Sequence, residues 1–166
     1  FAPFRKWQPS SRKAMRFVRG RVLDVGSGAG RHALHLQERG HEVVCIDNSP
    51  LALEVCRRRS VLETRELSVY QVSRSLGIFD TIITMGGNLG LLADIERGKR
   101  LLERFDRVTG PKARIIGETR DPHHGDDPTH TAYHESNLKQ GKMDGQIRIR
   151  VRYRQYVGAW INYMLV

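Results

Sequence analysis

The sequence predicts an α/β fold with a doubly wound, mainly parallel sheet flanked by helices. A short apolar run at residues 22–25 leads directly into a glycine-rich turn at 26–30, as expected where a buried parallel strand meets a helix. Apolar runs of strand length then alternate with segments of helical length as far as residue 119. A chain of 166 residues with 39% hydrophobic content is long enough for one domain with a substantial core.

The elements of this alternating region follow from local signals. Gly40 is typical of a residue that ends a helix, and Ser49 followed by Pro50 is typical of a helix start. Leu91, Ile95, Leu102 and Phe105 predict one apolar face of a later helix, which Thr109-Gly110-Pro111 should end. Helices are therefore expected over 10–19, 31–39, 51–59 and from about 91 to 108, and strands over 22–25, 41–46, 61–66, 79–84 and 113–118.

The pattern changes after Arg120. Residues 120–145 are polar and rich in Asp, His and Gly, which predicts a long loop. Residues 146–156 alternate between apolar side chains and arginines, as in a half-buried strand. A turn at 157–159 would return this strand to a second one over 160–166, so we expect an antiparallel hairpin appended to the core.

The glycine spacing after the first strand narrows the choice of ligand. A dinucleotide fingerprint needs glycines at the first, third and sixth positions, and Arg31 occupies the sixth. Gly26, Gly28 and Gly30 instead alternate behind Asp24. This D-x-G-x-G-x-G pattern resembles the first motif of the class I S-adenosylmethionine (SAM) dependent methyltransferases.

The resemblance extends over residues 15–118 and implies a Rossmann-like methyltransferase fold that uses SAM and releases S-adenosylhomocysteine (SAH). It organises residues 1–166 as one SAM-binding domain, with a cofactor-binding core at 10–119 and a substrate-side loop and hairpin at 120–166. The family's fold normally ends with another helix and two strands. We therefore expect the C-terminal part of the fold either to be missing or to be replaced by the hairpin.

The chemistry of SAM suggests a role for several residues. Glycines allow the backbone to approach the methionine portion and the ribose, and Asp24 can meet the ammonium group. Asp47 lies 47 − 26 = 21 positions after Gly26, where the acidic partner of a ribose diol is expected. The structural alternatives are a helix-capping role for Asp47 and a satisfied buried carboxylate for Asp24.

The resemblance adds further candidates. It places Asn48 beside the adenine, and the Phe79-Asp80 start of the fourth strand places residues 85–88 beside the sulfonium and the transferring methyl group. The acidic residue that the family carries after its third strand has no clear match, and Glu66 is a candidate only. The expected cofactor-binding residues are Asp24, Gly26, Ser27, Gly28, Gly30, Asp47, Asn48, Glu66, Leu67, Met85, Gly86 and Asn88.

The methyl acceptor is less constrained. The Asn/Asp-Pro-Pro-aromatic signature of amino-methylating DNA enzymes is absent from 85–88, and neither Cys45 nor Cys56 follows the fourth strand as a cytosine-C5 nucleophile would. These absences disfavour DNA-modifying chemistry. We expect a small-molecule acceptor, bound by a transferase that works through in-line displacement. A non-catalytic or truncated SAM-binding module and an RNA methyltransferase remain as alternatives.

The net charge of +10 is compatible with nucleic-acid binding, but it is scattered along the chain. Four alternating arginines, Arg148, Arg150, Arg152 and Arg154, form what we call the arginine stripe. The solvent-exposed face of a hairpin explains this stripe more simply than nucleic-acid binding does. The catalytic residue is open: His124 and His130 are candidate general bases that the sequence does not separate. The His and Asp spacing in this region matches no common metal-ligand pattern, so no metal is expected.

The sequence also suggests where the protein works. It contains no apolar run long enough to span a bilayer, and no signal peptide opens it. The spacing of Cys45 and Cys56 fits neither a metal site nor a disulfide framework. We therefore expect reduced thiols, a cytoplasmic location and no membrane partner.

Overall fold

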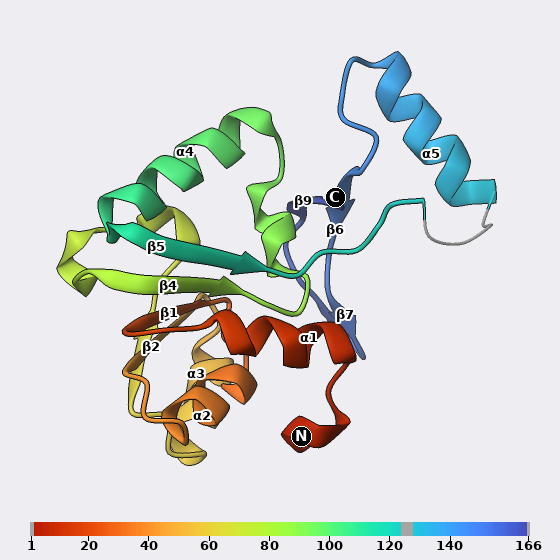
Figure 1. Cartoon of the computed structure of the whole chain (residues 1–166). Coiled ribbons are helices and arrows are strands. Elements are labelled where there is room, and N and C mark those ends of the chain that lie inside the picture. The colour runs from red at the N-terminus through yellow and green to blue at the C-terminus, as the bar shows by residue number, and fades with distance from the viewer. Residues whose placement is uncertain (1, 124–127, 166) are drawn as a thin grey trace. The chain divides into compact units, whose positions relative to one another are not determined.

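The computed structural model describes residues 2–123 and 128–165 (Figure 1). The chain forms two compact units, each of which is described by itself. The first unit comprises Phe1–Asn88 with Leu101–Glu118, and the second comprises Leu89–Arg100 with Thr119–Val166.

The first unit is built on a five-stranded parallel sheet with the order β3-β2-β1-β4-β5. Every neighbouring pair runs parallel, which confirms the predicted doubly wound topology. Because all strands run the same way, their carboxyl ends share one edge of the sheet. The strands are β1 (Val22–Val25), β2 (Val43–Asp47), β3 (Glu63–Glu66), β4 (Phe79–Thr84) and β5 (Thr109–Gly117).

Helices connect these strands. Ser49 caps α3, because its hydroxyl accepts a hydrogen bond from the Ala52 amide at 3.3 Å, and Pro50 follows at the first helical position as expected. The predicted opening helix is shorter than expected, since its last turn tightens into a 3-10 helix at Met15–Phe17. The helices of the first unit are α1 (Pro9–Ala14), α2 (Arg31–Gln37) and α3 (Pro50–Arg58), and α4 (Ile95–Arg107) belongs to it from Leu101 onward. Short 3-10 helices cover Phe4–Lys6, Val69–Gln71, Arg74–Leu76 and Asn88–Leu92.

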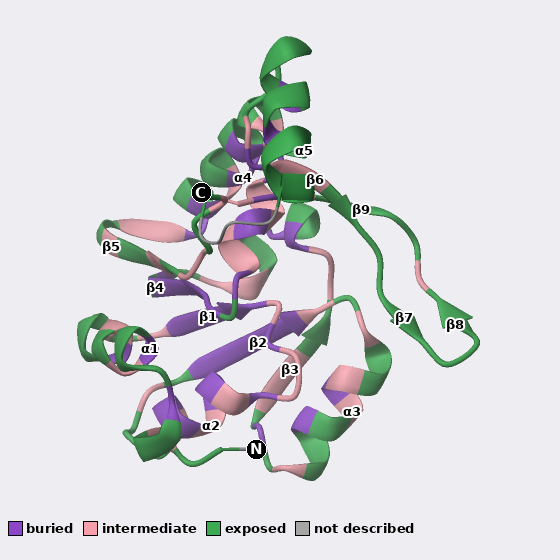
Figure 2. Ribbon diagram, turned by 90° about the vertical axis from the view of Figure 1, so that its right-hand side faces the viewer, coloured by how far each residue is buried: buried purple, intermediate pink, exposed green. Residues whose placement is uncertain are grey.

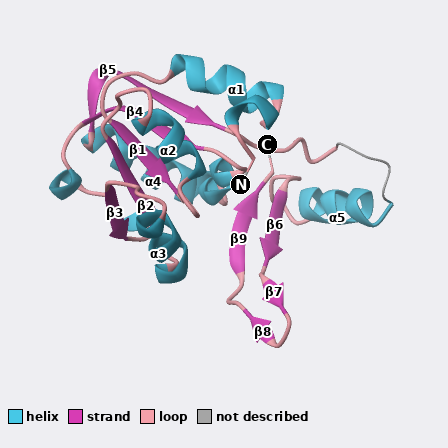
Figure 3. Ribbon diagram, turned by 90° about the horizontal axis from the view of Figure 1, so that it is seen from below, coloured by secondary structure: helices cyan, strands magenta, loops and turns pink. Residues whose placement is uncertain are grey.

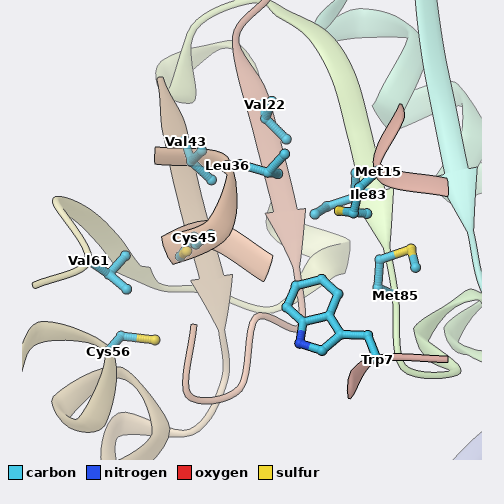
Figure 4. Packing of buried hydrophobic residues seen from close by; sticks show 11 residues of the cluster. Trp7, Met15, Val22, Leu36, Val43, Cys45, Cys56, Val61, Ile83 and Met85 are labelled. Carbon is cyan, nitrogen blue, oxygen red and sulfur yellow. The ribbon is translucent and has the colours of Figure 1, made fainter. Parts of the chain in front are cut away.

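The central strands β1 and β2 are buried along almost their whole length (Figure 2). On one face of the sheet, Val22, Cys45 and Ile83 pack in a cluster with Leu36 of α2. Trp7, which precedes α1, joins the same cluster beside Met85 at the carboxyl ends of the strands (Figure 4). The N-terminal segment therefore covers one side of the edge where a ligand of this fold class binds.

The helix before β5 buries only part of the predicted face. Leu101 and Phe105 are 2% exposed, whereas Ile95 is 57% and Leu102 is 46% exposed. The helix also begins at Ile95, so that Leu91 lies in the preceding 3-10 helix. The prediction is confirmed for Phe105 and wrong for Ile95 and Leu102, because it selected apolar residues before the helix boundaries were known. β5 also starts at Thr109, four positions before the predicted start, because Gly110 and Pro111 lie within the strand.

The second unit contains a helix where a loop was expected. α5 (Pro128–Lys139) occupies much of the region 120–145. Most of its side chains are exposed, and only His134 and Asn137 are buried. It therefore has no apolar stripe from which a periodicity argument could have found it.

The predicted hairpin is present (Figure 3). β6 (Gln146–Ile149) pairs antiparallel with β9 (Ile161–Met164), and β7 (Arg152–Tyr153) pairs with β8 (Tyr156–Val157). The chain reverses at Arg154, whose φ is 52°, rather than at the predicted 157–159. The Gly158 amide instead donates to the Val151 carbonyl at 2.8 Å, and Gly158 lies in the segment that leads from β8 back to β9. In the described residues, no helix has the length and apolarity needed to cross a bilayer.

The two faces of α4 provide a direct test of the core. Leu101→Ala should lower the free energy of unfolding by about 2–4 kcal/mol, because truncating this buried side chain leaves a cavity in the core. Leu102→Ala should cost less than about 1 kcal/mol, because that side chain is half exposed. Chemical denaturation of both variants measures this difference. Equal losses would contradict the burial pattern of this helix.

Candidate functional site

The glycine-rich turn is fixed to the end of β2 by backbone hydrogen bonds. The amides of Gly26 and Ser27 both donate to the Ile46 carbonyl, at 2.9 and 3.1 Å. The turn ends where Gly30, with φ 73°, forms the N-cap of α2. A strand, a tight turn and a helix N-terminus are thus brought together at the carboxyl edge of the sheet.

The three alternating glycines meet three different constraints. A Cβ at Gly26 would collide with the side chain of Asn88, and a Cβ at Gly30 would lie 2.6 Å from Val61 Cγ2. Gly28 differs, because a Cβ there would meet nothing within 4 Å. Its φ of 54° nevertheless favours glycine. The middle of the turn therefore presents bare backbone to open space, while its two ends are packed.

Asp47 ends β2 and ties the turn to the next helix. Its Oδ2 accepts from the Gly28 amide at 2.9 Å, and its Oδ1 accepts from the Ser49 amide at 2.8 Å. The side chain is half-buried. Each carboxylate oxygen has a second lone pair, so this position can accept hydrogen bonds from a ligand while it holds the turn.

Asp24 lies in β1 and is only 1% exposed. Its Oδ2 is buried and has no hydrogen-bond partner. Burial, reinforced by the negative charge of Asp47, raises the pKa of Asp24 from 3.8 to about 7, against the lowering effects of the Ala33 amide and of Arg31. A buried carboxylate oxygen without a partner is costly and points to a cationic group that is absent from the protein alone.

The segment after β4 closes the other side of the turn. Asn88 Nδ2 donates to the carbonyls of Val25 and Gly26, at 3.0 and 2.7 Å. The Gly86 amide donates to Glu118 Oε2 at 2.8 Å, and Glu118 Oε1 accepts from the Ser11 hydroxyl of α1 at 2.8 Å. Glu118 therefore links three segments at the carboxyl edge: the end of β5, the loop after β4 and the N-terminal helix.

The structure places the predicted cofactor residues in the first unit, at the carboxyl ends of β1 to β4. Glu66 pairs in register with Asp47 at the end of β3 and is exposed, and the Leu67 amide donates to the Asp47 carbonyl at 3.0 Å. Asn48 is exposed beside them, and Met85 is buried. These placements bring the proposed residues together, while their individual roles stay predictions.

The histidine candidates lie elsewhere. His130 is exposed on α5 in the second unit, and His124 lies outside the described residues. Burial raises the pKa of both Cys45 and Cys56, which disfavours the thiolate form that a nucleophilic cysteine needs. Both thiols are free, as expected.

Sequence reasoning missed two residues at this edge. Glu118 follows β5, and its position at the carboxyl end of the predicted strand 113–118 was the available signal. Trp7 is 6% exposed although it lies in a polar N-terminal stretch without periodicity, and no local pattern would have identified it.

The unusual burial of Asp24 has a measurable cost. A carboxyl with a raised pKa binds its proton more tightly in the folded state, so its ionisation removes stability as the pH rises from about 4 through about 7. The free energy of unfolding of Asp24→Asn, relative to that of the wild type, should therefore rise by about 2–3 kcal/mol when the pH is raised from 5 to 8. Urea denaturation at both pH values measures this gain. The exposed Asp106→Asn is the matched control, and a gain that does not grow with pH would contradict the burial of an ionisable Asp24.

Comparisons with known proteins agree with this geometry. A family model described as a methyltransferase domain matches residues 22–112. A glycine/sarcosine N-methyltransferase from Halorhodospira halochloris is 29% identical over 124 residues, which cover 69% of this chain and 46% of that protein. A magnesium-protoporphyrin O-methyltransferase from Rhodobacter capsulatus is 30% identical over 106 residues, which cover 58% of this chain and 47% of that protein. The chain thus spans less than half the length of either relative.

A solved structure extends the likeness beyond the sheet. The SAM-dependent methyltransferase from Bacteroides fragilis, crystallised with S-adenosylhomocysteine, superposes with a TM-score of 0.78 at 26% identity. The match covers 97% of this chain and 64% of that one. With the family model covering more than half of its residues, this chain belongs to the class I SAM-dependent methyltransferase family.

Proposed function

We propose that this protein transfers a methyl group from SAM to a small-molecule acceptor. The observation that carries the proposal is the buried, unpartnered Oδ2 of Asp24 in β1, together with the open space at Gly28 in the turn that follows this strand. The ammonium of a methionine group would supply the missing partner, and the glycine turn leaves room for the adjoining chain of that ligand. The residues present therefore fit SAM.

Further residues at the edge have proposed roles. Asp47 holds the ribose diol, since its carboxylate keeps one lone pair on each oxygen beyond the two amides that it already accepts. Asn48, Glu66 and Leu67 border the adenine at the ends of β2 and β3. Ser27, whose hydroxyl is buried without a partner, and the segment 85–88 border the methionine portion and the sulfonium.

SAM supplies an activated methyl group, and the protein contributes position and the exclusion of water. Met85 and Trp7 are buried side by side in the cluster at the edge and keep solvent from this side of the site. Glu118 acts as a positioning residue, because it holds the loop after β4 against α1. A general base is needed only for an acceptor that must lose a proton, and His130 and His124 stay the candidates from the sequence.

The acceptor class is supported by the names of the relatives. One acts on glycine and sarcosine and another on magnesium protoporphyrin, which are small molecules of very different size. We propose that the second unit binds the methyl acceptor, because it contains most of the region 120–166 for which the sequence predicts a substrate-side role. We also propose a cytoplasmic location, which the free thiols Cys45 and Cys56 support because such thiols persist in a reducing compartment.

Transfer of label from methyl-labelled SAM tests the function and its alternatives together. The protein is incubated with a cell extract separated into low-mass, RNA and protein fractions. We expect label in the low-mass fraction, and a loss of at least about tenfold in Asp47→Ala, because the ribose would lose its carboxylate. Asp106→Asn should transfer at the wild-type rate. Label in RNA would favour the RNA methyltransferase, and SAH binding without transfer to any fraction would favour a non-catalytic module.

A further inference from the structure

The second unit contains a cavity of about 860 Å³ between α5 and the strand β6. Much of its wall is apolar, with Pro122, Tyr133, Ile147, Ile149 and Leu165 among the lining residues. Cavities of this size hold ligands well above the size of a single small amino acid. The cavity therefore suits a ligand with an extended apolar or aromatic body.

Positive charge lines the same cavity. Arg120 and Arg148 both line the cavity, and neither forms an ion pair with another residue in the part of the chain that the structure describes. Asp121 also lines the cavity, but one of its oxygens already accepts from the His123 amide at 2.9 Å. Among the described residues of the lining, positive charge is thus in excess, which favours an anionic group on the ligand.

His134 adds an oriented polar atom. This side chain lines the cavity and is only 7% exposed. Its Nδ1 lies 2.7 Å from the Asp144 carbonyl oxygen, and Nδ1 must be the donor because a carbonyl can only accept. In the neutral ring, Nε2 is then an acceptor, and no described residue is hydrogen-bonded to it. A hydroxyl or an amine on the ligand would satisfy it.

We propose that this cavity is a binding site for an organic anion with an apolar body and a hydroxyl or amino group. Arg120 and Arg148 bind the anionic group, the apolar wall holds the body, and His134 Nε2 accepts a hydrogen bond from the hydroxyl or the amine. The assignment of this ligand as the methyl acceptor rests on the proposed function. The binding site itself does not, because its recognition elements all lie in the second unit.

The carboxylate probe 6-hydroxy-2-naphthoate and its neutral amide 6-hydroxy-2-naphthamide test the charge requirement. Their fluorescence is titrated with the full chain in the absence of SAM, so that the result does not depend on methyl transfer. We expect the carboxylate to bind at least about tenfold more tightly than the amide, because the amide lacks the charge that the arginines recognise. Naphthalene-2-carboxylate, which lacks the hydroxyl, should bind more weakly than the hydroxylated carboxylate, because His134 would lose its donor.

Variants then locate the binding. Arg148→Gln and Arg120→Gln should each lower the affinity for the carboxylate probe about tenfold and leave the affinity for the amide unchanged. Arg152→Gln is the matched control, because Arg152 is exposed on the same hairpin and does not line the cavity. Equal affinity for the carboxylate and the amide, or no binding of either by the wild type, would overturn the proposal without reference to any variant. An equal loss of affinity for the carboxylate in Arg152→Gln would also overturn it. A separate titration that finds no binding of SAH would count only against the proposed function.

Discussion

The attachment of the glycine turn to the end of β2 is the constraint on which the candidate site depends. The Ile46 carbonyl accepts from Gly26 and Ser27, and the Asp47 carboxylate accepts from Gly28. These hydrogen bonds occupy three backbone donors of the turn, so its conformation is fixed by the protein itself. The site is therefore preorganised, and ligand binding would not have to order this backbone. The packing at Gly26 and Gly30 also restricts the conformation of the turn, because neither position has room for a side chain.

Asp24 shows that this preorganisation has a cost. The protein holds a carboxylate in its interior with one oxygen unpartnered, and burial raises the pKa of that group to about 7. The charged form is thus destabilised in the protein alone and would be stabilised by a bound cation. Such opposition between stability and binding is common at functional sites.

The sequence predicted the first unit well, since most of its signals are local. The glycine turn, the Ser49 cap and the apolar strands each depend on residues within a few positions of one another. The second unit was predicted less well. α5 has no apolar stripe, and the reversal at Arg154 uses a non-glycine residue with positive φ, which local turn rules do not favour. Glu118 was missed because its partners Ser11 and Gly86 are distant in sequence, and only the fold brings the three together.

The proposed contact between the buried Asp24 carboxylate and the ammonium of the cofactor should change the proton balance of binding. Calorimetric titration with SAH at pH 7, in two buffers of different ionisation enthalpy, measures the protons released on binding. With a pKa of about 7, Asp24 is about half protonated before binding, and an adjacent cation should drive that proton off. We expect release of about half a proton by the wild type and none by Asp24→Asn. Binding with no release by the wild type, or with equal release by both proteins, would contradict it.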